Sequence, residues 1–269
     1  MQDKWLLLRG LGREHAHWLD FPERLRAASG VSEVVCVDLP GTGTEYARAA
    51  PHSITDNADD VLQRLVHRED VAQVRWWVFG ISLGGMVALE MATRAELQIA
   101  GVVIANSSSP LSRSTQRMRI TALPRLLVAM ATSNAVIRER KVLALTSNKD
   151  AHENEAVAEK LAAAYRQRPM ARQAVFNQLR AAARFELPQK LSVPLLVLSS
   201  RRDRLVNPCC SVRLAHHFGA QHKVHPRAGH DLVVDDCDWV CEQVRRWQAA
   251  HRPPSYAARM NGSSIAARG

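Results

Sequence analysis

Short apolar segments alternate along this chain with amphipathic stretches, and this alternation limits the fold more than any other feature. Each apolar segment is brief and rich in β-branched or aromatic residues, and the stretches between them have helical spacing. Strands and helices that alternate in this way form a mostly parallel sheet covered by helices on both faces. The sequence therefore predicts an α/β fold, with strands at Trp5–Arg9, Val34–Asp38, Val74–Phe79, Ile99–Ala105, Val193–Ser199 and His222–His225.

The alternation stops after Asn106 and resumes near residue 193. The intervening stretch begins with Ser107-Ser108-Ser109-Pro110 and is then rich in Ala, Leu, Arg, Glu and Gln, which favour helices. We expect residues 1–106 and 189–252 to form one α/β core, and residues 107–188 to be a helical segment inserted into it. Residues 253–269 begin with two prolines and have no periodicity, which predicts a disordered tail.

The formal charge of +10 raises the question of nucleic-acid binding, because clustered basic residues neutralise phosphates. The basic residues occur singly and in pairs along the whole chain, and no zinc-finger, RNP or basic-zipper pattern accompanies them. This distribution favours a solvated basic surface over a specific site for a polyanion. We therefore expect no specific nucleic-acid partner.

Cysteine usage and hydropathy indicate a soluble cytoplasmic protein. The apolar run after the N-terminus is too short for a signal peptide, and nowhere do about 18 apolar residues run together. The five cysteines are odd in number and lack the spacing of a zinc site, so we expect no metal. We also expect no organic cofactor and no membrane partner. A homodimer is left open. The cysteines are Cys36, Cys209, Cys210, Cys237 and Cys241.

The run Gly80-Ile81-Ser82-Leu83-Gly84 matches the pattern G-x-S-x-G where a predicted strand turns into a predicted helix. A serine on such a turn is held in a strained backbone conformation that exposes its hydroxyl above the sheet. Gly80 and Gly84 flank it because side chains there would collide where the strand and the helix crowd together. An ordinary glycine-rich turn with a capping serine is the alternative. The strand and helix around the motif favour Ser82 as a nucleophile.

A serine nucleophile needs a histidine to take its proton and a carboxylate to orient that histidine. In the chain order Ser, acid, His, the candidates are Asp203, after the strand that ends at Ser199, and His230, after the last strand. Asp203 could instead form surface ion pairs with the arginines around it, which would contribute little stability. Three other acids lie nearer to His230 in sequence but are less suitably placed: Asp231, Asp235 and Asp236.

The first strand ends in a glycine-bracketed turn, Arg9-Gly10-Leu11-Gly12-Arg13. This turn would present the Leu11 N–H to a developing oxyanion, and the Leu83 N–H would be the second donor. Gly10 and Gly12 could equally serve only to permit a tight turn.

In these motifs the chain resembles the α/β-hydrolase superfamily, in the branch of small bacterial esterases and related hydrolases that carry a cap. The resemblance extends to about His251 and includes Asp38-Leu39-Pro40-Gly41-Thr42-Gly43 after the second strand. Such families usually have a histidine at the positions of Arg9 and Thr42. The resemblance implies an α/β-hydrolase fold in which residues 107–188 form a helical cap over the pocket and select the acyl or alcohol group.

Together these observations predict a serine hydrolase, a carboxylesterase that acts on a small-molecule ester. Ser82 would attack the carbonyl, His230 would carry the proton, Asp203 would orient His230, and an acyl-enzyme would form and be hydrolysed. A thioesterase and a carbon–carbon bond hydrolase are close alternatives, because the same site serves all three reactions. A protein that keeps the fold and binds a ligand without catalysis is the alternative outside enzymes.

Overall fold

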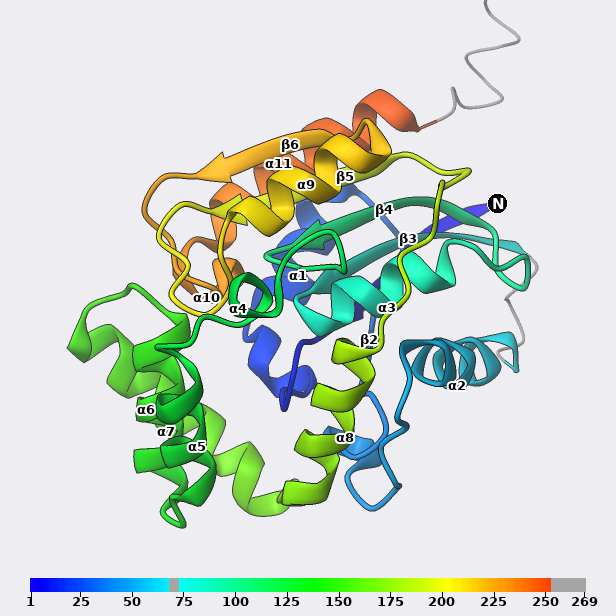
Figure 1. The fold of residues 1–269 in the computed structure, drawn as a ribbon. Coiled ribbons are helices and arrows are strands. Elements are labelled where there is room, and N and C mark those ends of the chain that lie inside the picture. The colour runs from blue at the N-terminus through cyan, green and yellow to red at the C-terminus, as the bar shows by residue number, and fades with distance from the viewer. Residues whose placement is uncertain (68–72, 253–269) are drawn as a thin grey trace, which may run out of the picture.

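A six-stranded parallel sheet forms the centre of the protein (Figure 1). The computed structural model describes residues 1–67 and 73–252, so the predicted tail lies outside the described residues. The strands are arranged in the order β2-β1-β3-β4-β5-β6. Their bounds are Gln2–Leu8 (β1), Glu33–Val37 (β2), Val74–Ile81 (β3), Ile99–Ala105 (β4), Leu195–Ser200 (β5) and Gln221–His225 (β6).

The six predicted strands are all present, and β1 differs most from its predicted bounds. It starts three residues before Trp5 because Gln2 already pairs with Val74 of β3. The polar residues at its start have partners, since the Asp3 carboxylate accepts a hydrogen bond from Arg75 Nε at 2.6 Å. Arg9 was predicted to end the strand and instead lies just beyond it.

The period-two alternation of the strands divides the core between the two faces of the sheet. Leu6 and Leu8 pack on one face with the apolar sides of α2, α3 and α9, whereas Trp5 and Leu7 pack on the other face with α1 and α11. Burial of each such side chain stabilises the fold by about 1.5–3 kcal/mol. The helices of these two layers are α1 (Phe21–Ser29), α2 (Ile54–Val66), α3 (Leu83–Met91), α9 (Cys209–Phe218) and α11 (Cys237–His251).

Between β4 and β5 the described chain holds five helices. Figure 1 shows α5, α6 and α7 grouped at the lower left beside the core, and α8 running back toward α3. None of the described helices is long and apolar enough to cross a membrane. The inserted helices are α4 (Ser114–Arg117), α5 (Leu123–Ala131), α6 (Ala135–Thr146), α7 (Ala151–Gln167) and α8 (Arg172–Ala183).

Three short helical segments were not predicted: η1 (His15–Trp18), η2 (Gly43–Glu45) and α10 (Leu232–Asp235). Each is too short to show helical periodicity in the sequence. All five cysteines, which lie within the described residues, are free thiols.

Candidate active site

Ser82 lies on the turn that joins β3 to α3 and has φ 55° and ψ −116°. A positive φ is uncommon outside glycine and costs about 1–3 kcal/mol, so the surrounding structure must hold it. The Ser82 N–H donates to the carbonyl of Ala105 at 2.9 Å, and the Ser107 hydroxyl donates to the Ser82 carbonyl at 2.7 Å. Within the described residues the Ser82 side chain accepts no hydrogen bond from the first turn of α3, so it does not cap that helix.

Steric constraints explain both glycines of the turn. A Cβ on Gly80 would lie 2.3 Å from the carbonyl oxygen of Gly84, and a Cβ on Gly84 would lie 2.2 Å from that of Leu8. Both distances are far below van der Waals contact, so the strand, the turn and the helix can approach only with glycine at these positions. The collision predicted from the sequence is therefore present.

His230 and Asp203 meet above the carboxyl ends of β5 and β6. The ring Nδ1 of His230 lies 2.8 Å from Oδ2 of Asp203, and the two side chains are 7 % and 1 % exposed. The other carboxylate oxygen of Asp203 accepts the N–H groups of Leu205 and Val206 at 2.7 and 2.9 Å. These contacts orient the carboxylate toward the imidazole, and no surface ion pair of Asp203 exists among the described residues.

The acids that lie nearer to His230 in sequence have other partners. Asp231 pairs with Arg9, Asp235 accepts hydrogen bonds from Ser147 and from backbone N–H groups, and Asp236 caps α11. The Ser82 hydroxyl makes no hydrogen bond to His230 in the described part of the chain. In unliganded sites such catalytic contacts are often long, and they tighten when substrate binds.

Asn106 connects the Ser82 turn to the His230 loop, and the sequence did not point to this role. It follows Ala105, which holds the Ser82 N–H, and its amide donates to the His230 carbonyl at 2.7 Å and to the Ser200 hydroxyl at 2.9 Å. Its φ is 46°, a value that Asn tolerates better than most residues. An Asn directly after an apolar run was the signal that the sequence offered.

The glycine turn after β1 lies beside Ser82. A Cβ on Gly10 would come 3.1 Å from Cβ of Ser82, and Gly12 has φ 65°. The Gly12 N–H donates to Gln178 of α8 at 2.9 Å, which anchors the turn to the inserted helices. The N–H groups of Leu11 and Leu83 donate to no group among the described residues, so both remain free to act as donors.

Arg9, where the related families usually have histidine, forms a buried ion pair with Asp231. Arg9 Nη1 donates to Asp231 Oδ1 at 3.3 Å, Nη2 donates to Oδ2, and the guanidinium carbon lies 4.6 Å from the ring centroid of Trp18. Burial opposes ionisation of Asp231, but the charge and hydrogen bonds of Arg9 outweigh it and hold the pKa of Asp231 below its usual value. The pair joins the end of β1 to the residue beside His230.

A second buried ion pair ties the glycine turn to the inserted helices. Arg13 Nη1 lies 2.5 Å from Oε2 of Glu139 on α6, and the Glu139 side chain is 2 % exposed. Burial would raise the pKa of Glu139, but Arg13 and the neighbouring His17 keep it well below the usual range. The segment after β1 therefore depends on α6 as well as on α8.

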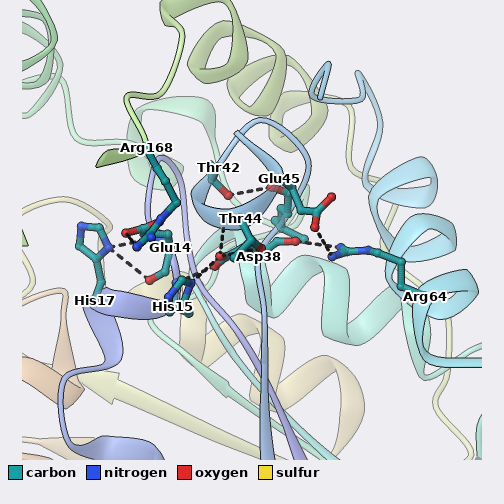
Figure 2. Close-up of polar contacts among 10 residues, drawn as sticks. Glu14, His15, His17, Asp38, Thr42, Thr44, Glu45, Arg64 and Arg168 are labelled. Atoms are coloured by element: carbon teal, nitrogen blue, oxygen red, sulfur yellow. Dashed lines mark hydrogen bonds and ion pairs between the residues drawn. The ribbon is translucent and has the colours of Figure 1, made fainter. Parts of the chain in front are cut away.

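Figure 2 shows a polar cluster around Asp38, the first residue of the loop where Thr42 stands in place of the usual histidine. Asp38 Oδ2 lies 2.6 Å from Nδ1 of His15 and accepts the Thr44 N–H at 2.9 Å. The Thr42 hydroxyl donates to the carbonyl of Leu39 at 2.7 Å, which closes the loop without a histidine.

Glu14, His15 and Asp38 hold three ligand atoms within 4.8 Å of one another, a spacing that a metal ion could use. Both carboxylate oxygens of Glu14 already accept hydrogen bonds from Arg168, at 2.8 and 2.9 Å (Figure 2). This bidentate pair supplies the positive charge that a cation would bring. The cluster thus fastens η1 to the end of α7, and we assign no metal to it.

Ser82 lines a pocket of about 250 Å³. Leu11 and Leu83 line it, and the inserted helices contribute residues from α4 and α8. Most of the wall is apolar. The other lining residues are Met86, Ser108, Ser114, Arg117, Met118, Leu179, Ala182, Ala183, Leu205 and Val206.

Comparisons with known proteins give the same fold. A protein of Variovorax paradoxus (strain S110) that is named as a carbamate hydrolase, RutD, is 28% identical over 216 residues, which cover 78% of this chain and 77% of that protein. The structure of the enol-lactonase from Burkholderia xenovorans LB400 matches with a TM-score of 0.73 and 21% identity, covering 93% of this chain and 92% of that chain. A thermophilic esterase from Thermogutta terrifontis matches with a TM-score of 0.68 and 20% identity, covering 93% and 90%. The model of the alpha/beta hydrolase family matches residues 5–243, nearly the whole described chain, and the protein therefore belongs to this family of hydrolases.

Proposed function

We propose that this hydrolase cleaves carboxylic esters through Ser82, His230 and Asp203. The observation that carries the proposal is the 2.8 Å hydrogen bond between the buried His230 and Asp203, on the edge of the sheet where the strained Ser82 turn also lies. Because Asp203 occupies Nδ1, the other ring nitrogen of His230 is the one that can take a proton from a nucleophile.

In the proposed reaction the Ser82 hydroxyl attacks the ester carbonyl and its proton passes to His230. The N–H groups of Leu11 and Leu83 stabilise the oxyanion, and each such donor is typically worth about a hundredfold to a thousandfold in rate. His230 then protonates the departing alcohol, and an acyl-enzyme on Ser82 remains. Water, deprotonated by His230, hydrolyses the acyl-enzyme and restores the serine.

The dimensions and lining of the pocket support a substrate with a small or medium apolar group. A volume of about 250 Å³ is slightly below the range of roughly 300–1,000 Å³ that is typical of ligand pockets. Residues of α4 and α8 contribute to the wall, which supports the proposal that residues 107–188 act as a cap and select the substrate.

The test is labelling with a fluorophosphonate probe followed by a screen of p-nitrophenyl esters of graded chain length. The native protein should be labelled and should hydrolyse short and medium esters, whereas Ser82→Ala should do neither. His230→Ala should lose turnover while it retains the fold by circular dichroism. A native protein that remains unlabelled and hydrolyses no ester would refute the proposal.

The same screen should include carbamates, because the relative from Variovorax paradoxus is named as a carbamate hydrolase. A carbamate ester presents a carbonyl to the same nucleophile and oxyanion donors. Thioesters are attacked in the same way. The ratio of kcat/KM between matched ester, thioester and carbamate would rank the three classes.

A further inference from the structure

A second hollow, of about 740 Å³, lies beside the Ser82 pocket. The two are separated by a wall in which Arg119 N–H donates to the Leu205 carbonyl and Asn207 N–H donates to the Gln116 carbonyl, both at 2.9 Å. Met118 and Leu205 line the Ser82 pocket, whereas Arg119 and Arg204 line the second hollow. We call this hollow the arginine groove, after Arg119, Arg125, Arg201, Arg202 and Arg204, which line it.

The arginines of the groove are not neutralised by protein acids. None of the five has an ion pair within residues 1–67 and 73–252. The acid in the lining is Asp203, which is 1 % exposed and has both its oxygens engaged by His230 and by backbone N–H groups. Elsewhere the exposed arginines are often paired, as Arg48 is with Glu45 and Asp60. The groove thus concentrates positive charge that no acidic side chain of the described residues pairs with.

The sequence alone favoured a solvated basic surface, since the arginines are scattered along the chain. Folding brings together Arg119 from the segment after α4, Arg125 from α5, and three arginines from the loop after β5. Arg119 also has its Nε buried with no hydrogen-bond partner among the described residues. Like charges in one concavity repel each other, and a buried donor without an acceptor is unfavourable. An anionic ligand in the groove would relieve the repulsion between the arginines.

We propose that the arginine groove binds a phosphate-bearing anion. Guanidinium groups present planar forks that match phosphate oxygens in two-point hydrogen bonds, and several arginines at one site select a multiply charged group. The hollow is large enough for such a group, since its volume falls within the usual range of ligand sites.

The phosphates can come from two sources. They can belong to the leaving group of the substrate, because neighbouring residues of the same two segments line the groove and the pocket that contains Ser82. They can also belong to a separate small molecule that binds beside the site. The first source rests on the proposed function, and the second does not.

The first experiment measures binding without reference to catalysis. Tripolyphosphate is titrated into the protein by isothermal calorimetry in 0.15 M NaCl. The variant Arg125→Gln/Arg202→Gln changes two exposed arginines of the groove, and Arg26→Gln/Arg180→Gln removes the same charge from two exposed arginines outside it. We expect saturable binding by the native protein, at least tenfold weaker binding by the groove variant, and a change of less than twofold in the control.

The second experiment compares hydrolysis of acetyl-coenzyme A with that of S-acetyl-N-acetylcysteamine, which has the same acyl group on a thiol without phosphates. If kcat/KM for the phosphorylated thioester alone falls at least tenfold in the groove variant, the phosphates belong to the leaving group. If the groove variant loses tripolyphosphate binding but hydrolyses both thioesters like the native protein, the anion is a separate molecule. Both results support an anion site.

Two results would overturn the proposal. One is the absence of saturable tripolyphosphate binding by the native protein, and the other is an equal loss of binding in the groove and control variants, which would indicate diffuse surface charge. Failure of the proposed function is recognised separately, because a protein that is neither labelled by fluorophosphonate nor active on any ester can still bind tripolyphosphate.

Discussion

Replacing Arg9 by Met should destabilise the protein strongly, because it leaves Asp231 as a buried carboxylate without its partner. Both side chains of the pair are almost fully buried, at 4 % and 6 % exposure, so solvent cannot replace the lost contact. Removing one partner of a buried ion pair typically costs about 3–5 kcal/mol. At roughly 2 °C per kcal/mol for a domain of this size, the midpoint of thermal unfolding should fall by about 6–10 °C.

The pH dependence of this loss has a definite sign. In the native protein Arg9 lowers the pKa of Asp231. The contribution of the ionised Asp231 to the free energy of unfolding is therefore present above the pKa of the unfolded state, and it is lost as the pH falls through the pKa of the folded state. Without Arg9, burial raises the pKa of Asp231, and the carboxyl group becomes protonated in the folded state at a higher pH than before. The deficit of Arg9→Met should therefore be largest at neutral pH and should shrink as the pH falls toward 4.

Urea unfolding of the native protein, Arg9→Met and Arg9→Met/Asp231→Leu at pH 7 and pH 5 checks this reasoning. The double variant removes both charges and should recover most of the lost stability, because no unpaired carboxylate remains. A deficit below about 1 kcal/mol for Arg9→Met, or a double variant no more stable than the single one, would refute it.

Three further predictions concern the residues around Ser82. Gly84→Ala places a Cβ 2.2 Å from the Leu8 carbonyl oxygen and should abolish soluble expression. Gly219→Ala, at φ 60° with open space around it, should lower the free energy of unfolding in urea by only about 1 kcal/mol. Equal soluble yields of the two variants would contradict the steric account. Asp203→Asn should lower kcat for an ester by about ten-thousandfold, because His230 loses the group that fixes its tautomer; steady-state kinetics within tenfold of the native protein would exclude Asp203 as that group. Asn106→Ala removes the donor to the His230 carbonyl and should lower kcat by up to about a hundredfold with little change in KM; a change in KM alone would mean that Asn106 acts on the pocket instead.

The sequence predicted the parts of the fold that depend on neighbours along the chain. The strands were visible because fully buried parallel strands are continuous apolar runs, and the Ser82 turn was visible because its glycines lie two residues on either side. Asp203 and His230 could be chosen as candidates because the acid and then the histidine follow the serine along the chain in this fold. The hydrogen bond between them depends on how two loops 27 residues apart are arranged in space. The sequence could only suggest that arrangement.

Contacts between distant polar residues were beyond the sequence. Arg9 and Asp231 are 222 residues apart, and nothing in either local sequence indicates the other. The amide of Asn106 binds Ser200 at the end of β5 and the His230 loop after β6, and its role follows only from the arrangement of strand ends. The arginine groove could not be predicted for the same reason, because its arginines come from three separate segments of the chain.

The attachment of the inserted helices has a consequence for protein engineering. Gly12 is bonded to Gln178, Arg13 to Glu139 and Glu14 to Arg168, so three consecutive residues that follow β1 are each held by a different inserted segment. The helices between β4 and β5 therefore cannot be exchanged independently of the segment that follows β1. A chimera that exchanges residues 107–188 for those of another family member would leave these three positions without matching partners, and a graft intended to change specificity must transplant residues 10–17 together with the insert.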